Sequence, residues 1–200
     1  VSNKWMLGTR NSFIIGISAT FLATALGTVA ALGLSRRNMP FKGTIMAILI
    51  SPMIVPLIIT SAGMFFFYSK IGLTHTYLGL ILAHTALGTP FVVITVTATL
   101  TGFDTNLIRA SQSLGADTMR TFFKVIMPLI LPGVISGGLF AFITSFDEVV
   151  VVMFVGSVEQ ITIPKQMWAG LRQETSPVIL CMATCLVALS IGLLTTVEML

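Results

Sequence analysis

Five long stretches of this 200-residue chain contain no Asp, Glu, Lys or Arg: 11–35, 43–69, 71–103, 125–146 and 175–197. Each stretch is long enough to supply the roughly 20 residues that a helix needs to cross the hydrocarbon core of a bilayer. Only 9% of all residues are charged and 55% are hydrophobic, whereas a soluble domain carries about 25% charged residues. Such a chain cannot cover itself with a surface that suits water, so we expect lipid to surround it.

Lipid offers the backbone no hydrogen-bond partners, so each crossing should be a helix. The continuous apolar runs also differ from the alternating ten-residue segments of a transmembrane barrel. We therefore predict an all-α, polytopic integral membrane protein that forms a single domain over residues 1–200. Five transmembrane helices are expected near 12–34, 44–68, 77–100, 131–155 and 177–199.

The charged residues between these helices predict an orientation. One pair of loops, 35–42 and 102–124, carries most of the positive charges: Arg36, Arg37, Lys42, Arg109, Arg120 and Lys124. The loops on the opposite side carry Lys70, Lys165 and Arg172. The positive-inside rule places the first pair of loops in the cytoplasm. The N-terminal segment, with Lys4 and Arg10, then lies outside and weakens the bias.

Small residues recur at every fourth position of the first helix, and this spacing predicts close packing against another helix. They are Ala19, Ala23, Gly27 and Ala31. We expect Gly137, Gly138 and Ala141 to act in the same way in the fourth helix.

Pro52 and Pro56 lie one turn apart in the second helix, and each removes a backbone donor. A bent helix beside a transport pathway and an ordinary packing kink both fit this pattern.

For His84 in the third helix, a neutral imidazole bonded to a neighbouring helix is favoured over a proton relay. Cys181 and Cys185 fit small packing residues, since too few ligands accompany them for a metal site. We predict no metal and no cofactor.

The segment 102–132 has a different pattern from the rest of the chain. Leu107, Ala110, Ser111 and Leu114 are spaced as one face of a helix, which Asp104 or Thr105 can cap. Gly115 suits the end of that helix, where a left-handed conformation favours glycine. A second apolar stripe follows, formed by Met119, Phe122, Phe123 and Ile126. We expect two short amphipathic helices before Pro128 and Pro132 begin the fourth span; they could lie on lipid headgroups or dock a partner.

This segment resembles the EAA loop of binding-protein-dependent ABC permeases, in which Glu-Ala-Ala is followed after three residues by Gly and after nine more by Ile-x-Leu-Pro. Arg109-Ala110-Ser111 takes the place of Glu-Ala-Ala, Gly115 follows at the family spacing, and Val125-Ile126-Met127-Pro128 follows after nine residues. The resemblance implies a coupling helix seated in a cytoplasmic ATPase. The implied coupling residues are Leu107, Arg109, Ala110, Ser111, Leu114, Gly115, Ala116 and Pro128.

One residue departs from the family pattern. Arg109 stands where the family has glutamate, which reverses the charge. We therefore expect the partner's groove to be acidic or neutral, with shape and apolar contact carrying most of the docking.

The resemblance extends over nearly the whole chain. "SPMIVPLII" is similar to the proline-bearing second helix of the family, and "AHTALGTPFVV", "SFDEVVVVMF" and "TIPKQMW" resemble its polyamine-type branch. The resemblance implies a type I importer of the bacterial inner membrane that works by alternating access. It implies four kinds of partner: a second permease subunit of different sequence, two ATPase subunits, a periplasmic solute-binding protein and membrane lipid. This branch has six helices per subunit, so the missing one is expected before Val1.

Asp147 and Glu148 interrupt the apolar run of the fourth predicted helix, about 15 residues from its start and roughly 22 Å along its axis. Carboxylates at membrane depth are costly and face a water-filled cavity or a partner. Adjacent helix positions point about 100° apart, so we expect one to meet solute and the other to bond a neighbouring helix. A structural pair or a gate at the outer mouth fits equally well. With Pro52 and Pro56, these acids are the candidate pathway residues.

The acid pair and the branch resemblance make a cationic, polyamine-like solute the first choice. Opines, other amino-acid-like compounds and ferric iron remain alternatives. A secondary transporter is the competing class, and it would be expected to show internal repeats and several intramembrane ionisable groups. The sequence contains no HExxH, GxSxG or P-loop motif, so we predict a non-catalytic subunit whose ATP is hydrolysed by a separate chain. It also contains no basic stripe with interleaved aromatics, so nucleic acid is not an expected partner.

Overall fold

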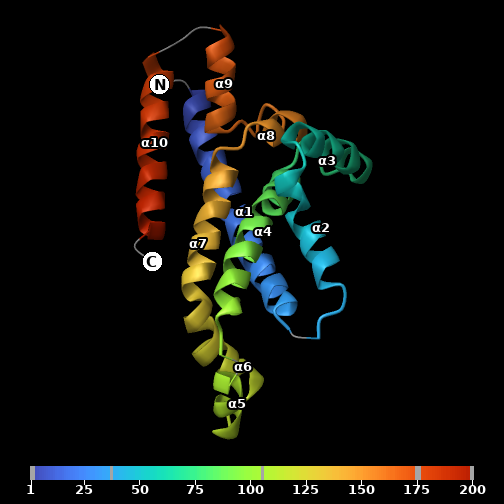
Figure 1. The fold of residues 1–200 in the computed structure, drawn as a ribbon. Coiled ribbons are helices and arrows are strands. Elements are labelled where there is room, and N and C mark those ends of the chain that lie inside the picture. Colours follow the sequence, from blue (N-terminus) through green and yellow to red (C-terminus); the bar gives the residue numbers. More distant parts are fainter. Residues whose placement is uncertain (1–2, 37, 105, 174–176, 199–200) are drawn as a thin grey trace.

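The computed structural model describes residues 3–36, 38–104, 106–173 and 177–198. Arg37, Thr105 and Met199, which belong to the predictions above, lie outside the described residues. The described part of the chain consists of helices joined by short segments and contains no strand, which confirms the predicted class (Figure 1). Its helices are α1 (Asn3–Leu34), α2 (Lys42–Ile54), α3 (Leu57–Ile71), α4 (Tyr77–Thr101), α5 (Asn106–Ser113), α6 (Thr118–Thr121), a π-helical turn (Phe122–Ile126), α7 (Met127–Phe146), α8 (Val150–Val155), α9 (Ile163–Gln173) and α10 (Pro177–Glu198).

Four helical segments are long and apolar enough to cross a membrane: α1, α4, the continuous run Thr118–Phe146, and α10. The fifth predicted crossing, 44–68, is not one helix. It is the pair α2 and α3, which meet at a bend of 104°. Pro56 accounts for the break, because a proline disfavours helical geometry in the residue before it, and Val55 is extended (φ −69°, ψ 135°). Pro52 lies inside α2 without ending it.

The fourth predicted helix, 131–155, was wrong at both ends. Its helix begins near Thr118, because α6, the π-helical turn and α7 form one continuous span, so the second short amphipathic helix is not a separate element. The π-helical turn comes just before Pro128, whose ring would clash with the carbonyl of Lys124 in a regular helix. At the other end α7 stops at Phe146, and α8 starts only at Val150.

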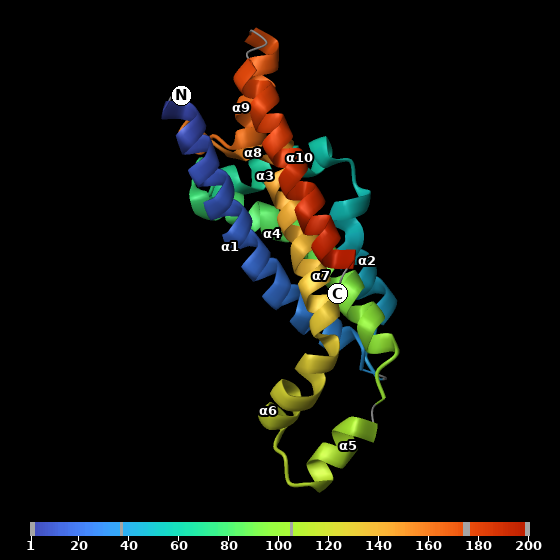
Figure 2. The same ribbon diagram turned by 90° about the vertical axis from the view of Figure 1, so that its left-hand side faces the viewer.

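Helices α1, α4 and α7 pack against one another and form the core (Figure 2). The predicted small-residue stripe of α1 is confirmed, since Ala19, Ala23, Gly27 and Ala31 are all buried. A Cβ atom on Gly27 would lie 2.7 Å from Cβ of Val92 on α4. One on Gly137 of α7 would lie 2.8 Å from Cα of the same valine. The glycines therefore let both helices approach α4 at backbone distance.

The remaining helices surround this core. Helix α10 runs beside α7 and α9, and most of its described side chains are exposed (Figures 1 and 2). Helix α9 was not predicted, because 156–176 was interpreted as a loop. Pro164, next to the start of α9, is a residue type that favours the first turn of a helix and could have signalled it.

Candidate functional site

The two candidate regions lie toward opposite ends of the molecule (Figure 1). Helices α5 and α6 form one end, here called the loop end. The acid pair Asp147 and Glu148 lies between α7 and α8, toward the end that holds α3, α9 and the N-terminus, here called the α9 end. Any function that uses both regions must therefore connect them along the α1–α4–α7 core.

The loop end is shaped by its turn residues. Gly115 adopts φ +82° directly after α5, which confirms the expected left-handed position. Its amide donates to the Gln112 carbonyl (2.9 Å), and the Ala116 amide donates to the Ser111 carbonyl (3.1 Å). Asp104 accepts from the Asn106 amide (2.9 Å) at the start of α5. These bonds fix both ends of a helix of only eight residues.

The side chains of α5 and of Leu114, the residue after it, divide into exposed and buried sets. Arg109, Ala110 and Leu114 are exposed, with Leu114 at 88%. Ser111 is buried, and its Oγ lies 2.9 Å from Thr121 Oγ1 in a hydrogen bond that joins α5 to α6. Ser111 therefore holds the loop together, while its predicted neighbours face outward.

The three remaining implied coupling residues occupy different surroundings. Leu107 is 43% exposed, whereas Ala116 is half-buried beside Gly115. Pro128 lies in the first turn of α7, so it belongs to a membrane-spanning helix. Its link to the loop runs through α6 and the π-helical turn, which form one continuous helix with α7.

An apolar groove separates the loop from the ends of α1 and α4. Its lining includes Leu32 of α1, Leu100 and Phe103 at the end of α4, Ile108 of α5 and Phe122 of the π-helical turn. Helix α5 is held through contacts with α6 and with that turn. The tip formed by α5 and residues 114–117 is thus packed on α6 and the π-helical turn, at the end of the α7 span.

At the α9 end, the acid pair does not lie inside a helix. The prediction that both acids lie within the fourth predicted helix, 131–155, was wrong, so helical spacing does not set their side chains about 100° apart. Asp147 is exposed, whereas Glu148 is 6% exposed and its Oε1 accepts from the Val151 amide (2.9 Å). The two carboxylates therefore differ in surroundings, because Glu148 is used to hold the start of α8.

Asp147 lines a hollow between the end of α7 and the start of α3. The hollow also includes Leu57, Ile143 and Thr144. Leu57 directly follows Pro56, so the break between α2 and α3 brings the start of α3 to the acid pair. Pro52 lines a different hollow, beside Leu26 of α1 and Tyr68 of α3. Pro56, and not Pro52, is thus adjacent in sequence to a residue that lines the hollow of the acid pair.

His84 on α4 is buried, and its Nδ1 lies 2.8 Å from Ser145 Oγ on α7. The expected bond to a neighbouring helix is confirmed.

Cys181 and Cys185 are both exposed on α10. Within the described ranges, no three His, Cys, Asp or Glu side chains gather as a metal site requires.

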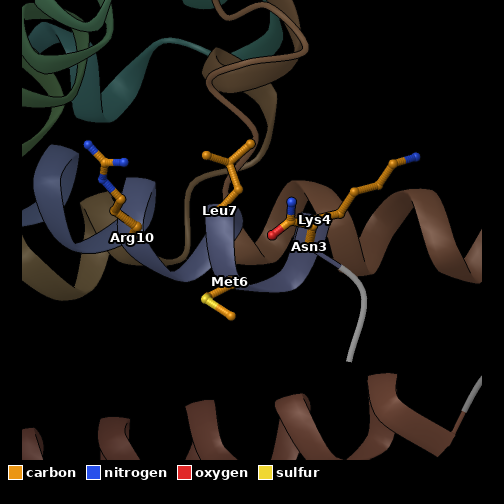
Figure 3. A pocket seen from close by; sticks show the side chains of 5 residues that line it. All are labelled: Asn3, Lys4, Met6, Leu7 and Arg10. Carbon is orange, nitrogen blue, oxygen red and sulfur yellow. The ribbon is translucent and has the colours of Figure 1, made fainter.

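A further hollow lies beside the first turns of α1 (Figure 3). Its lining residues all come from this one helix: Asn3, Lys4, Met6, Leu7 and Arg10. Lys4 and Arg10 diverge from each other, so the hollow offers no converging set of polar groups.

The hydrogen-bonding roles of Asn11 and Lys165 were not predicted from the sequence. Asn11 is fully buried; its Nδ2 donates to the carbonyls of Glu159 (2.8 Å) and Ile161 (2.9 Å), and its Oδ1 accepts from the Tyr77 hydroxyl (2.8 Å). An amide at the edge of a long apolar run needs such partners, and this requirement could have flagged it. Lys165 Nζ donates to the Val152 carbonyl (3.0 Å) and the Ser157 carbonyl (3.3 Å).

Comparison with known proteins gives a consistent family assignment. The family model described as "Binding-protein-dependent transport system inner membrane component" matches residues 23–200. The chain is 31% identical over 183 residues to the spermidine/putrescine transport system permease protein PotC of Haemophilus influenzae, a match that covers 92% of this chain and 71% of the relative. It is 30% identical over 190 residues to PotC of Escherichia coli K12, covering 95% of this chain and 72% of the relative.

Two further proteins are similar. The putrescine transport system permease protein PotI of Escherichia coli K12 is 30% identical over 183 residues, which covers 86% of this chain and 64% of PotI. An inward-facing structure of the MetNI methionine ABC transporter superposes with a TM-score of 0.78 at 20% identity, covering 99% of this chain and 96% of the matched chain. The structural match supports the fold.

Proposed function

Because the chain belongs to the family of binding-protein-dependent transport system inner membrane components, we propose that it forms half of an ATP-driven import pathway for a small cationic, polyamine-like solute. It is a multi-pass inner membrane protein and a permease subunit of an ABC importer. Residues 1–200 act as one domain, and hydrolysis of ATP takes place on a separate subunit.

The observation that carries the proposal is the exposed tip around Gly115 at the loop end. Arg109, Ala110 and Leu114 are exposed there, on and just after α5, which packs on α6 at the start of the α7 span. We infer that the tip sits in a groove of a cytoplasmic ATPase and passes its motion to α7. The loop end is then cytoplasmic, as the positive-inside rule predicts, and the α9 end faces outside.

The other partners are proposed from the family to which the chain belongs. Two permease subunits of different sequence enclose the passage, two ATPases drive it between outward-open and inward-open states, and a periplasmic binding protein delivers solute at the α9 end. Asp147, Glu148, Pro52 and Pro56 are the residues proposed for the passage. Of these, Asp147 presents an exposed carboxylate in a hollow.

A polyamine is favoured over opines, other amino-acid-like solutes and ferric iron for two reasons. Three relatives at about 30% identity are permeases named for spermidine or putrescine. The exposed Asp147 carboxylate also attracts the ammonium groups of a cationic solute.

Uptake of labelled spermidine into vesicles that hold the complete transporter tests the proposed class. We expect uptake to need ATP, to stop with vanadate and to continue when the proton gradient is collapsed. Accumulation without ATP that disappears with the ion gradient would instead identify a secondary transporter.

The two acids should respond differently to substitution. Asp147→Asn is expected to raise KM for a cationic solute about tenfold, equivalent to about 1.4 kcal/mol. The protein level should not change, because the exposed Asp147 side chain makes no hydrogen bond or ion pair with the described residues. Glu148→Ala is expected to lower stability by about 1–3 kcal/mol, because it leaves the buried Val151 amide without its acceptor. KM from uptake and thermal unfolding in detergent measure the two effects.

Glu159→Gln is the matched control, since Glu159 is an exposed acid at the same end of the molecule. It should change neither quantity. An unaltered KM in Asp147→Asn would remove Asp147 from the solute path.

A further inference from the structure

Charged side chains hold both ends of the short helix α8. At its start, Glu148 Oε1 accepts from the Val151 amide (2.9 Å). At its end, Lys165 Nζ donates to the Val152 carbonyl (3.0 Å) and to the Ser157 carbonyl (3.3 Å). Each charge has the sign that favours its helix end, negative at the N-terminus and positive at the C-terminus.

Helix α8 has only six residues and needs such support, because an isolated helix of this length is unstable. Its inner face is buried through Val151, Val152 and Val155. The Val155 carbonyl accepts from the His75 amide (2.8 Å). The helix packs on α3, whose first residue lines the same hollow as Asp147. Val149 and Val150, at the start of α8, also line this hollow, so a shift of α8 alters its shape.

Lys165 belongs to α9, which is fixed to a different part of the molecule. The Ile163 amide donates to Ser12 Oγ (2.9 Å), and Asn11 donates to the carbonyls of Glu159 and Ile161. Segment 156–162 and the start of α9 are thus tied to α1. The Lys165 side chain extends from this α1-bound segment to α8.

The environment of Lys165 distinguishes it from an ordinary surface lysine. A surface lysine keeps its ammonium group in water while its alkyl stem lies on the protein. Lys165 is half-buried with its ammonium on two carbonyls, and burial lowers the pKa of this group from its usual value. The desolvated charge is compensated by carbonyl groups at the end of α8.

We propose that Lys165 is a positioning residue that couples α9 to α8, so that displacement of the outer segment is passed to the hollow containing Asp147. The coupling of α9 to α8 through Lys165 concerns this chain alone. The consequence for solute rests on the proposed function, because it assumes that Asp147 meets solute.

Spin-label distances test the coupling of α9 to α8 without any solute. Labels are placed at Met153→Cys on α8 and Leu171→Cys on α9, both exposed positions, in a chain with Cys181→Ser and Cys185→Ser. In vesicles that contain the full transporter, we expect a narrow distance distribution for Lys165 and for Lys165→Arg, which keeps the donors. Lys165→Met should broaden it. Lys70→Met, at an exposed lysine of α3, is the control and should leave it narrow.

A narrow distribution in Lys165→Met would overturn the proposal, and so would a broad one in Lys165→Arg. If Lys165→Met does not accumulate, Lys165→Gln, which is shorter and uncharged, replaces it with the same expected broadening.

Uptake kinetics then test the consequence for solute. Lys165→Met should raise KM about tenfold with Vmax changed less than about twofold, and Lys165→Arg should restore KM. A purely structural role would lower the amount of active protein, and hence Vmax, at constant KM. Absence of uptake in the unaltered transporter would refute the proposed function and leave the distance test intact.

Discussion

Replacing Gly115 with valine is expected to abolish ATP-driven uptake while the chain still inserts into the membrane. Gly115 has φ +82°, and a left-handed conformation costs other residues about 1–2 kcal/mol. A β-branched side chain is least suited to this position. The turn should rearrange, which breaks the bonds from the Gly115 and Ala116 amides to α5. The exposed tip would then no longer match an ATPase groove. Uptake into vesicles, normalised to inserted protein, measures the effect.

Two variants control for effects other than backbone conformation. Gly115→Asn should keep a substantial part of the uptake, because asparagine tolerates the left-handed region. Gly102→Val should transport normally, since Gly102 has φ −88° and no atom of the described residues lies within 4 Å of an added Cβ. Wild-type uptake by Gly115→Val would remove the loop from the coupling mechanism.

Gly137→Val is expected to have the largest effect on folding. An added Cβ would lie 2.8 Å from Cα of Val92 and would also meet the Thr95 side chain, so helices α4 and α7 must separate. Overpacking costs about 1–3 kcal/mol in cores that can adjust, and here the obstacle is backbone. We expect the unfolding temperature to fall by about 10 °C or the chain not to accumulate.

Gly192→Val on α10 provides the comparison, because in the described part of the chain nothing lies within 4 Å of its added Cβ. It should melt like the unaltered chain. Equal melting temperatures for Gly137→Val and Gly192→Val would contradict the close α4–α7 packing.

The number and approximate place of the spans could be predicted because the solvent imposes them: 20 apolar residues cross the bilayer whatever their neighbours are. The residue at which a span breaks could not be predicted in the same way. Pro56 and Pro52 look alike in sequence, yet only Pro56 ends its helix. The break at Asp147–Val149 lies among apolar and acidic residues, without a Gly, Pro or Asn that would mark a turn. The sequence pattern therefore did not predict it.

The same distinction applies to the candidate site. Gly115 was predictable because its conformation is a property of one residue. The roles of Ser111, Asn11 and Lys165 depend on partners that the fold supplies, namely Thr121, the carbonyls of segment 156–162 and the end of α8. Helical spacing placed Ser111 on one face with Leu107, Ala110 and Leu114, which are exposed, whereas Ser111 is buried and bonds Thr121.

Crosslinking the loop end to an ATPase is the most direct test of the proposed coupling. Ser113→Cys places a thiol on the exposed side of α5 in a chain with Cys181→Ser and Cys185→Ser, and Ser69→Cys on α3 serves as the control at the opposite end. In intact vesicles with the complete transporter, a short bifunctional thiol reagent should join Ser113→Cys to a cysteine in the ATPase groove, with a yield that changes on addition of ATP. Ser69→Cys should give no such adduct. If Ser113→Cys forms no ATPase adduct in any nucleotide state, the loop end does not dock the ATPase.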